Sequence, residues 1–105
     1  MTILRRSDQE ESTPFEGAKM LLLAGAPTGA TMATVGDLTV EPGRRSVYHL
    51  HPNTEESIFI VKGEMEFRVG SSRFRASSGD CVLAPQGVGH GLENVGDYPA
   101  RLITI

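Results

Sequence analysis

The chain has 105 residues, a net charge of −3 and 39% hydrophobic residues. This length predicts one domain with a single core, and the slight acidity excludes a general affinity for nucleic acid or an anionic membrane surface. The longest apolar stretch, Met20 to Ala24, is too short to cross a bilayer, and Arg5 and Arg6 are not followed by the apolar region of a secretory signal. The one cysteine, Cys81, cannot form an internal disulfide. We therefore expect a cytoplasmic protein with no nucleic-acid or membrane partner.

Residues 1–14 are polar and aperiodic, and they predict a lead-in that is either disordered or paired with a sheet edge. Residues 15–105 are expected to form a single domain of short strands joined by turn residues, with Gly36-Asp37 as a hairpin turn. No window shows the apolar stripe of a helix, so the pattern favours an antiparallel all-β sandwich or barrel. The expected strands are Lys19–Ala24, Thr31–Val35, Leu38–Glu41, Ser46–His51, Glu56–Val61, Glu64–Val69, Arg73–Ala76, Cys81–Ala84, Gly91–Val95 and Ala100–Ile105.

The three histidines and one nearby carboxylate predict a single cation site. His49 and His51 are two residues apart on an expected strand, so both side chains leave the same face. Glu56 begins the next strand and shares its parity with Ile58, which places the carboxylate on an apolar interior face. His90 comes from a distant strand, as a site that is closed across a barrel requires.

Glu55 competes with Glu56 for the carboxylate position, because both closely follow His51. We prefer Glu56, which is separated from Gly63 by six residues rather than seven, and we expect Glu55 to be a solvated neighbour. Imidazole and carboxylate ligands suit one divalent transition metal ion, and Fe, Mn, Ni, Zn, Cu and Co all remain open. Four protein ligands leave two free positions on an octahedral ion, whereas tetrahedral zinc would be coordinatively closed.

Two segments of the chain resemble the two signature motifs of the cupin superfamily. Residues 43–63 read G-x5-H-x-H-x4-E-x6-G, and residues 79–94 read G-x5-P-x-G-x2-H-x3-N. The resemblance implies an antiparallel double-stranded β-helix, or jelly-roll barrel, of the small bacterial type. It also implies that His49, His51, Glu56 and His90 are the metal ligands. The matching positions are Gly43, His49, His51, Glu56, Gly63, Gly79, Pro85, Gly87, His90 and Asn94.

The resemblance leaves the reaction open. It implies a metalloenzyme of the dioxygenase or isomerase/cyclase class that acts on a small oxygenated organic molecule, with a non-catalytic metal- or ligand-binding cupin as the alternative. No catalytic residue is expected beyond the metal ligands. Arg45 and Gln86 are candidate substrate contacts, although for each the preferred interpretation is a plain exposed side chain. Ser46 stands where oxalate-type cupins carry arginine, which disfavours oxalate chemistry. Small cupins are commonly dimers, so a homodimer is expected.

Overall fold

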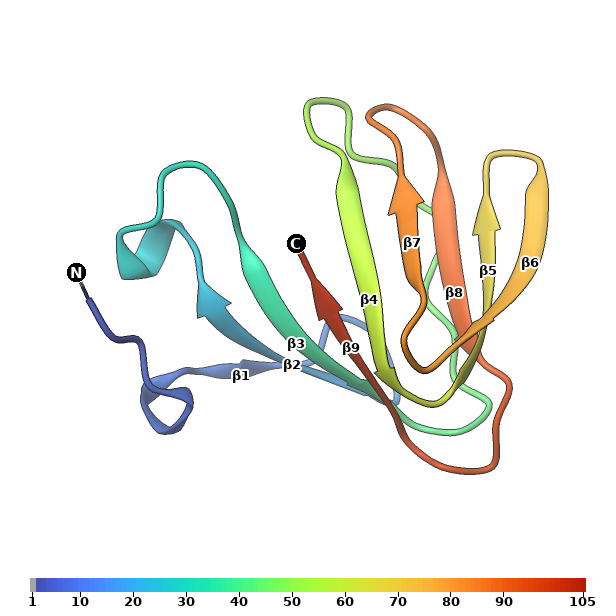
Figure 1. The fold of residues 1–105 in the computed structure, drawn as a ribbon, viewed down its shortest axis with the longest axis horizontal. Helices are drawn as coiled ribbons and strands as arrows, with labels where there is room; N and C mark the ends of the chain where they lie inside the picture. The colour runs from blue at the N-terminus through green and yellow to red at the C-terminus, as the bar shows by residue number, and fades with distance from the viewer. Residues whose placement is uncertain (1) are drawn as a thin grey trace.

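The computed structural model describes residues 2–105, which form an antiparallel, nearly all-β fold (Figure 1). This confirms the fold class that the sequence predicts. No helix among these residues is long and apolar enough to span a membrane. The elements, in chain order, are the short 3₁₀ turn η1 (Arg6–Asp8), β1 (Glu11–Ser12), β2 (Ala18–Ala24), the 3₁₀ turn η2 (Ala26–Thr28), β3 (Val35–Val40), β4 (Glu56–Lys62), β5 (Glu64–Val69), β6 (Ser72–Ser77), β7 (Cys81–Ala84), β8 (His90–Asn94) and β9 (Ala100–Thr104).

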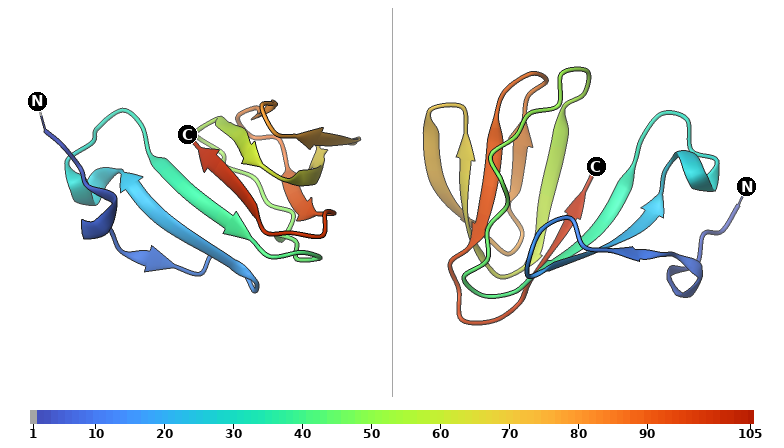
Figure 2. Two further views of the ribbon diagram at one scale, coloured as in Figure 1. Left: turned by 60° about the horizontal axis from the view of Figure 1, so that its bottom comes forward. Right: turned by 180° about the vertical axis from the view of Figure 1, so that it is seen from behind.

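The strands form two sheets. The larger has the order β1-β2-β3-β9-β4-β7, and the smaller has the order β6-β5-β8. Figures 1 and 2 show that β1, β2 and β3 splay away from the smaller sheet, while β4 and β7 lie beside it. The segment between β3 and β4, both strands of the larger sheet, runs along β8 of the smaller sheet, and it carries the first two histidines.

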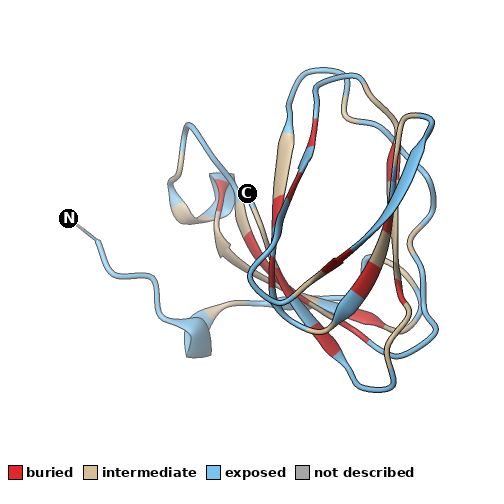
Figure 3. Cartoon of the chain, turned by 45° about the vertical axis from the view of Figure 1, so that its right-hand side comes forward, coloured by how far each residue is buried: buried red, intermediate tan, exposed pale blue. Residues whose placement is uncertain are grey.

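The core lies between the inner faces of the two sheets, where buried segments meet (Figure 3). The alternation along β5 is confirmed, because Met65 and Phe67 are buried while Glu64 and Arg68 are exposed. Each fully buried side chain of this size contributes about 1.5–3 kcal/mol of hydrophobic free energy. Their main partners are Leu38 and Val40 of β3, Ile58 and Ile60 of β4, and Leu102 of β9.

The expected hairpin turn at Gly36-Asp37 is wrong, because both residues lie inside β3. Gly36 is paired with Thr104, and a Cβ atom at Gly36 would lie 2.7 Å from the Thr104 hydroxyl oxygen. Glycine here therefore permits the close approach of two strands. The preceding residues 31–34, which were predicted to be a strand, form a loop instead.

Asp37 is only 3% exposed, and two arginines neutralise it. The Arg101 side chain donates to both carboxylate oxygens, at 3.0 and 2.8 Å, and Arg6 of η1 donates to one of them. The hydrogen bonds from Arg101 lower the pKa of Asp37 below its ordinary value, against the opposing effect of burial, and Arg6 adds to the lowering.

The lead-in is attached to the domain at two places. Arg6 reaches Asp37, and β1 pairs with β2 through the registers Glu11 with Leu21 and Ser12 with Met20. The first position of the predicted lead-in, Met1, lies outside the described residues. The attachment brings Phe15, which follows the lead-in, against the core.

Candidate metal centre

His49 and His90 face each other across an isolated antiparallel bridge. The His49 N–H donates to the His90 carbonyl at 2.9 Å, and the His90 N–H donates to the His49 carbonyl at 2.7 Å. The expected strand over residues 46–51 is otherwise irregular, and the neighbouring bridge, between Arg45 and Glu93, lies just before it. Direct pairing of the two backbones therefore brings these distant histidines together.

His51 and Glu56 are held at the two ends of the turn before β4. The Gly87 N–H donates to the His51 carbonyl at 2.9 Å, and the Gln86 amide donates to the Pro52 carbonyl at 3.0 Å. These bonds join the turn that carries His51 to the loop that precedes His90. Glu56 is the first residue of β4 and continues its inner face, as its parity with Ile58 predicts.

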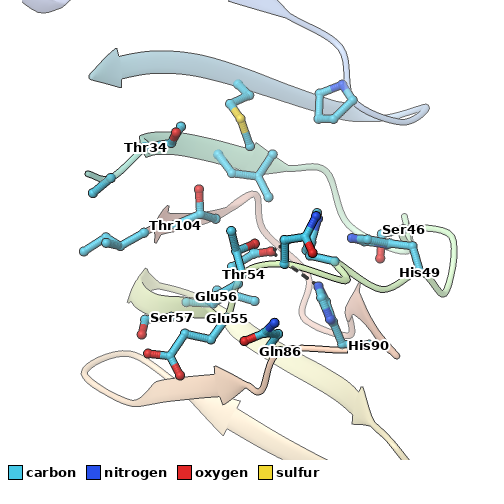
Figure 4. A pocket seen from close by; sticks show the side chains of 18 of the residues that line it. Thr34, Ser46, His49, Thr54, Glu55, Glu56, Ser57, Gln86, His90 and Thr104 are labelled. Carbon is cyan, nitrogen blue, oxygen red and sulfur yellow. Dashed lines mark ion pairs between the residues drawn. The ribbon is translucent and has the colours of Figure 1, made fainter. Parts of the chain in front are cut away.

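The four side chains converge on one point. A ligand atom from each of His49, His51, Glu56 and His90 lies within 4.8 Å of the others. Glu56 Oε2 is 3.1 Å from His51 Nε2 and 3.4 Å from His90 Nε2. Two ligand atoms about 2.1 Å from one ion and at right angles to each other lie about 3 Å apart. The four residues are thus positioned for a metal ion, and the dashed lines in Figure 4 mark contacts at Glu56.

The hydrogen bonding of the imidazoles suits a cation. His49 Nδ1 is 2.6 Å from the Val47 carbonyl oxygen, and His90 Nδ1 is 3.3 Å from that of Val88. A proton on Nδ1 in these contacts leaves the Nε2 lone pair free to bind a metal. Among the described residues, buried His90 Nε2 has no hydrogen-bond partner, although it lies 3.4 Å from Glu56 Oε2. A buried polar atom without a partner is costly, and a bound cation would satisfy it.

The site lies in an open cavity of about 1200 Å³. Apolar side chains from several elements line it, and Thr34 and Thr104 lie across it from His90 (Figure 4). Glu55 also lines the cavity and is exposed, as predicted for a solvated neighbour of Glu56. The main apolar lining residues are Phe15, Met20, Leu38, Ile58 and Leu92.

Residues 36–105 match the family model described as the Cupin domain. The chain belongs to the cupin family. The match covers both motifs and seven of the strands, from β3 to β9, and it confirms the resemblance found in the sequence.

Two relatives of this cupin have names that refer to different biochemical roles. Tetracenomycin polyketide synthase protein TcmJ of Streptomyces glaucescens is 28% identical over 87 residues, which are 83% of this chain and 58% of TcmJ. Oxalate decarboxylase OxdC of Bacillus subtilis is 31% identical over 104 residues, covering 92% of this chain and 27% of OxdC. This chain therefore spans less than two thirds of either relative.

Solved structures support the cupin fold. A structure of Bacillus subtilis OxdC superposes with a TM-score of 0.83 at 29% identity, covering 95% of this chain and 28% of that chain. Another structure of that decarboxylase concerns its Mn(II) centres. The polyketide cyclase RemF of Streptomyces resistomycificus superposes with a TM-score of 0.82 at 19% identity, covering 99% of this chain and 77% of RemF. The likeness to RemF shows a common fold.

The two candidate substrate contacts of this cupin lie in different places. Gln86 lines the cavity, although its amide nitrogen is engaged by Pro52. Arg45 does not line the cavity and instead borders a separate hollow with Tyr48 and Arg68. Arg45 would share the face of His49 only on a continuous strand, but the bridges of Arg45 with Glu93 and of His49 with His90 are out of step by one residue.

The sequence alone does not identify the apolar side chains that line the cavity outside the two motifs. Phe15 follows the lead-in, and Met20 belongs to β2, both outside the two motifs. Their apolar character is a sequence signal for burial, but only the pairing of β2 with β3 places them opposite the histidines.

Proposed function

We propose that this cupin binds one divalent transition metal ion through His49, His51, Glu56 and His90. We further propose that it is a metalloenzyme of the dioxygenase or isomerase/cyclase class, acting on a small oxygenated organic molecule. The observation that supports this most strongly is the convergence of four ligand atoms beside an open cavity, with His90 Nε2 buried and without a hydrogen-bond partner among the described residues.

The ion, when bound, would polarise a carbonyl or enol oxygen of the substrate. The residues of the chain would hold and orient the reactants. Contacts of His49 and His90 with backbone carbonyls fix which ring nitrogen faces the site. Glu56 supplies one negative charge beside them. Gln86 holds the turn after His51 in place through its hydrogen bond to the Pro52 carbonyl. The apolar side chains that line the cavity would exclude water from the surface of the bound molecule that they contact.

The names of the relatives support particular versions of this proposal. TcmJ is named as a polyketide synthase protein and RemF as a polyketide cyclase, and together these names favour the cyclase class within the proposed range. OxdC is a decarboxylase with Mn(II) centres, which favours Mn(II) among the candidate metals. Fe, Ni, Zn, Cu and Co suit the same donor set.

A non-catalytic metal- or ligand-binding cupin is the second candidate. Apart from the four proposed ligands, Glu55 is the only titratable side chain among residues 2–105 that lines the cavity. A catalyst that moves protons usually needs a positioned acid or base, and Glu55 is exposed. This scarcity favours a binding role, so the deciding experiment must measure turnover as well as affinity.

The test compares purified wild-type protein with Glu56→Gln and Glu55→Gln variants. We expect one metal ion per wild-type chain by mass spectrometry, and metal affinity at least tenfold lower in Glu56→Gln, because a neutral amide replaces an anionic ligand. Glu55→Gln is the matched control and should retain the metal. Turnover is then measured with enolic, catecholic and keto substrates and with Fe(II), Mn(II) or Ni(II).

Each result separates the proposals. Equal metal affinity of wild type and Glu56→Gln would contradict the metal site. Stoichiometric metal with no turnover of any of these substrates would favour the binding role.

We also propose that the protein is a homodimer. We propose that it is cytoplasmic, since the exposed thiol of Cys81 suits a reducing compartment.

A further inference from the structure

We infer that the cavity selects an uncharged, largely apolar chelating molecule of two or three fused rings and discriminates against anions. This inference rests on the proposed metal site and names the substrate class that the site would take. It is carried by the charges, the size and the surfaces of the cavity.

The charges of the cavity favour a neutral occupant. Among residues 2–105, no lysine or arginine lines it, whereas Glu55 and Glu56 both do. A bound dication would be balanced by these two carboxylates, so the site would have no net charge to attract an anion. Proteins that bind carboxylates or phosphates usually supply arginine or lysine for them.

Three arginines near the sheets that enclose the cavity, Arg6, Arg45 and Arg101, do not line it. Arg45 borders a different hollow from the one that holds the histidines. Arg6 and Arg101 both pair with buried Asp37, whose position in β3 alternates with that of inward-facing Leu38. Two carboxylates and no arginine thus remain beside the proposed ion.

The size and walls of the cavity favour an apolar body of several rings. Its volume of about 1200 Å³ exceeds the roughly 300–1,000 Å³ that is usual for the pockets of drug-sized ligands. Phe15, Met20 and Leu38 form an apolar wall that pairs well with a flat hydrocarbon surface. A molecule as small as oxalate would leave most of this volume to water.

The polar groups that remain are neutral. Thr34, Asn53, Thr54, Gln86 and Thr104 offer hydroxyl and amide groups to the cavity. These groups can donate to or accept from phenol, enol and ketone oxygens without a change of charge. A phenolic ketone that is uncharged in solution matches both ends of the cavity, because it can chelate through neighbouring oxygens once its phenol proton is released to solvent.

The experiment uses two probes with one carbon skeleton. One is an ortho-acetylnaphthol, which is neutral in solution, and the other is the corresponding ortho-hydroxynaphthoate, which is an anion. Each releases its phenol proton to solvent on chelation, so the hydroxynaphthoate still carries one more negative charge when bound. Both present two neighbouring oxygens to a metal. Binding of each probe to Ni(II)-loaded protein, with the metal content measured first, is followed by titration calorimetry, and the affinity of each probe for free Ni(II) is the reference.

We expect the acetylnaphthol to bind the loaded protein at least tenfold more tightly than the hydroxynaphthoate, although free Ni(II) favours the anion. Glu55→Gln removes one negative charge and should strengthen hydroxynaphthoate binding about fivefold, a typical effect of one partly screened charge, with less effect on the neutral probe. Glu64→Gln is the matched control, since Glu64 is an exposed carboxylate of β5 that does not line the cavity.

The outcomes separate this inference from the proposed function. Absence of stoichiometric Ni(II) would overturn the metal site itself. A loaded protein that binds the hydroxynaphthoate as tightly as the acetylnaphthol, or that binds neither probe, would overturn the inference while leaving the metal site intact. If Glu55→Gln and Glu64→Gln changed the affinity for the hydroxynaphthoate equally, Glu55 would have no part in the discrimination against anions.

Discussion

Asp37 shows how a single buried charge can be held in a sheet. Its side chain is 1% exposed, while those of its partners Arg101 and Arg6 are about half exposed, at 49% and 56%. Solvent therefore screens the arginine side of each pair, and we estimate a joint contribution of about 1–2 kcal/mol to stability. The same contacts fasten η1 to β3 and β9.

The lowered pKa of Asp37 predicts a specific dependence of stability on pH. A carboxyl group whose pKa is lower in the folded state adds stability above its unfolded pKa, about 3.9, and loses it as the pH falls through the folded value. Asp37→Asn should therefore be less stable than wild type by about 1–2 kcal/mol at pH 7, and the difference should shrink on acidification below pH ~4. Urea unfolding of metal-free protein at a series of pH values measures this.

A difference between wild type and Asp37→Asn that stayed constant, or grew, in acid would contradict this account. Glu10→Gln is a suitable control, because Glu10 is exposed and its substitution should leave the pH profile unchanged.

The proposed ligands and Asp37 differ in how far a sequence can reveal them. The histidines and Glu56 follow a fixed spacing, and the parity of Glu56 with Ile58 already places it on the inner face. Asp37 follows a glycine, so its local sequence predicts a turn. Its actual role depends on Arg101, which lies 64 positions away, and on Arg6 in the lead-in. No local pattern carries that information.

At the scale of elements, two turns of the barrel need glycine for different reasons. Gly63 joins β4 to β5 with φ +123°, and a Cβ there would lie 2.7 Å from the Cβ and 3.0 Å from the Cα of Ala100. Gly79 precedes β7 with φ +93°, and no other atom would lie within 4 Å of a Cβ there. Gly79 therefore serves backbone conformation alone, whereas Gly63 also permits contact with β9.

The matched variants Gly63→Ala and Gly79→Ala separate these effects. Gly79→Ala should cost about 1 kcal/mol, because alanine is strained at positive φ. Gly63→Ala should cost roughly 3 kcal/mol, because buried Ala100 cannot move without disturbing β9. Thermal and urea unfolding measure both. Equal costs would mean that the contact with Ala100 relaxes freely.

The sequence predicts some elements much better than others. The edges of β2 and of β4 to β9 agree with expectation to within one residue, because apolar runs and turn residues mark them, whereas the expected strands over residues 31–35 and 46–51 do not form as predicted. The segment from Arg45 to His51 contains an expected strand, Ser46–His51, yet it makes only isolated bridges with β8. Irregular backbone of this kind depends on its tertiary partners, so the sequence alone does not show that Arg45 borders a different hollow from the histidines.

At the scale of the whole molecule, the outer face of the larger sheet carries apolar side chains. Phe59 and Val61 of β4 and Leu83 of β7 are exposed there, on neighbouring strands. Apolar patches on an outer face often mark contacts between proteins. This is the face through which we propose that the homodimer forms.

Light scattering tests the dimer directly. Wild type should have twice the chain mass of 11.3 kDa, and the double variant Phe59→Lys, Leu83→Lys should shift toward monomer, because lysine would bury charge in the interface. Tyr98→Lys is the control, since Tyr98 is a more exposed aromatic residue in the loop between β8 and β9. A monomeric wild type at high micromolar concentration would rule out the proposed dimer.

The central place of β9 has a consequence for how the chain is made. β3 pairs with β2 and β9, and β4 pairs with β7 and β9, so β9 alone connects the two halves of the larger sheet. During synthesis, both histidine segments leave the ribosome before residues 100–104 do. Until then the inner faces of β3 and β4 lack the strand between them and expose apolar surface. Sheet closure must therefore wait for β9, and a stalled nascent chain that lacks it would be prone to aggregate.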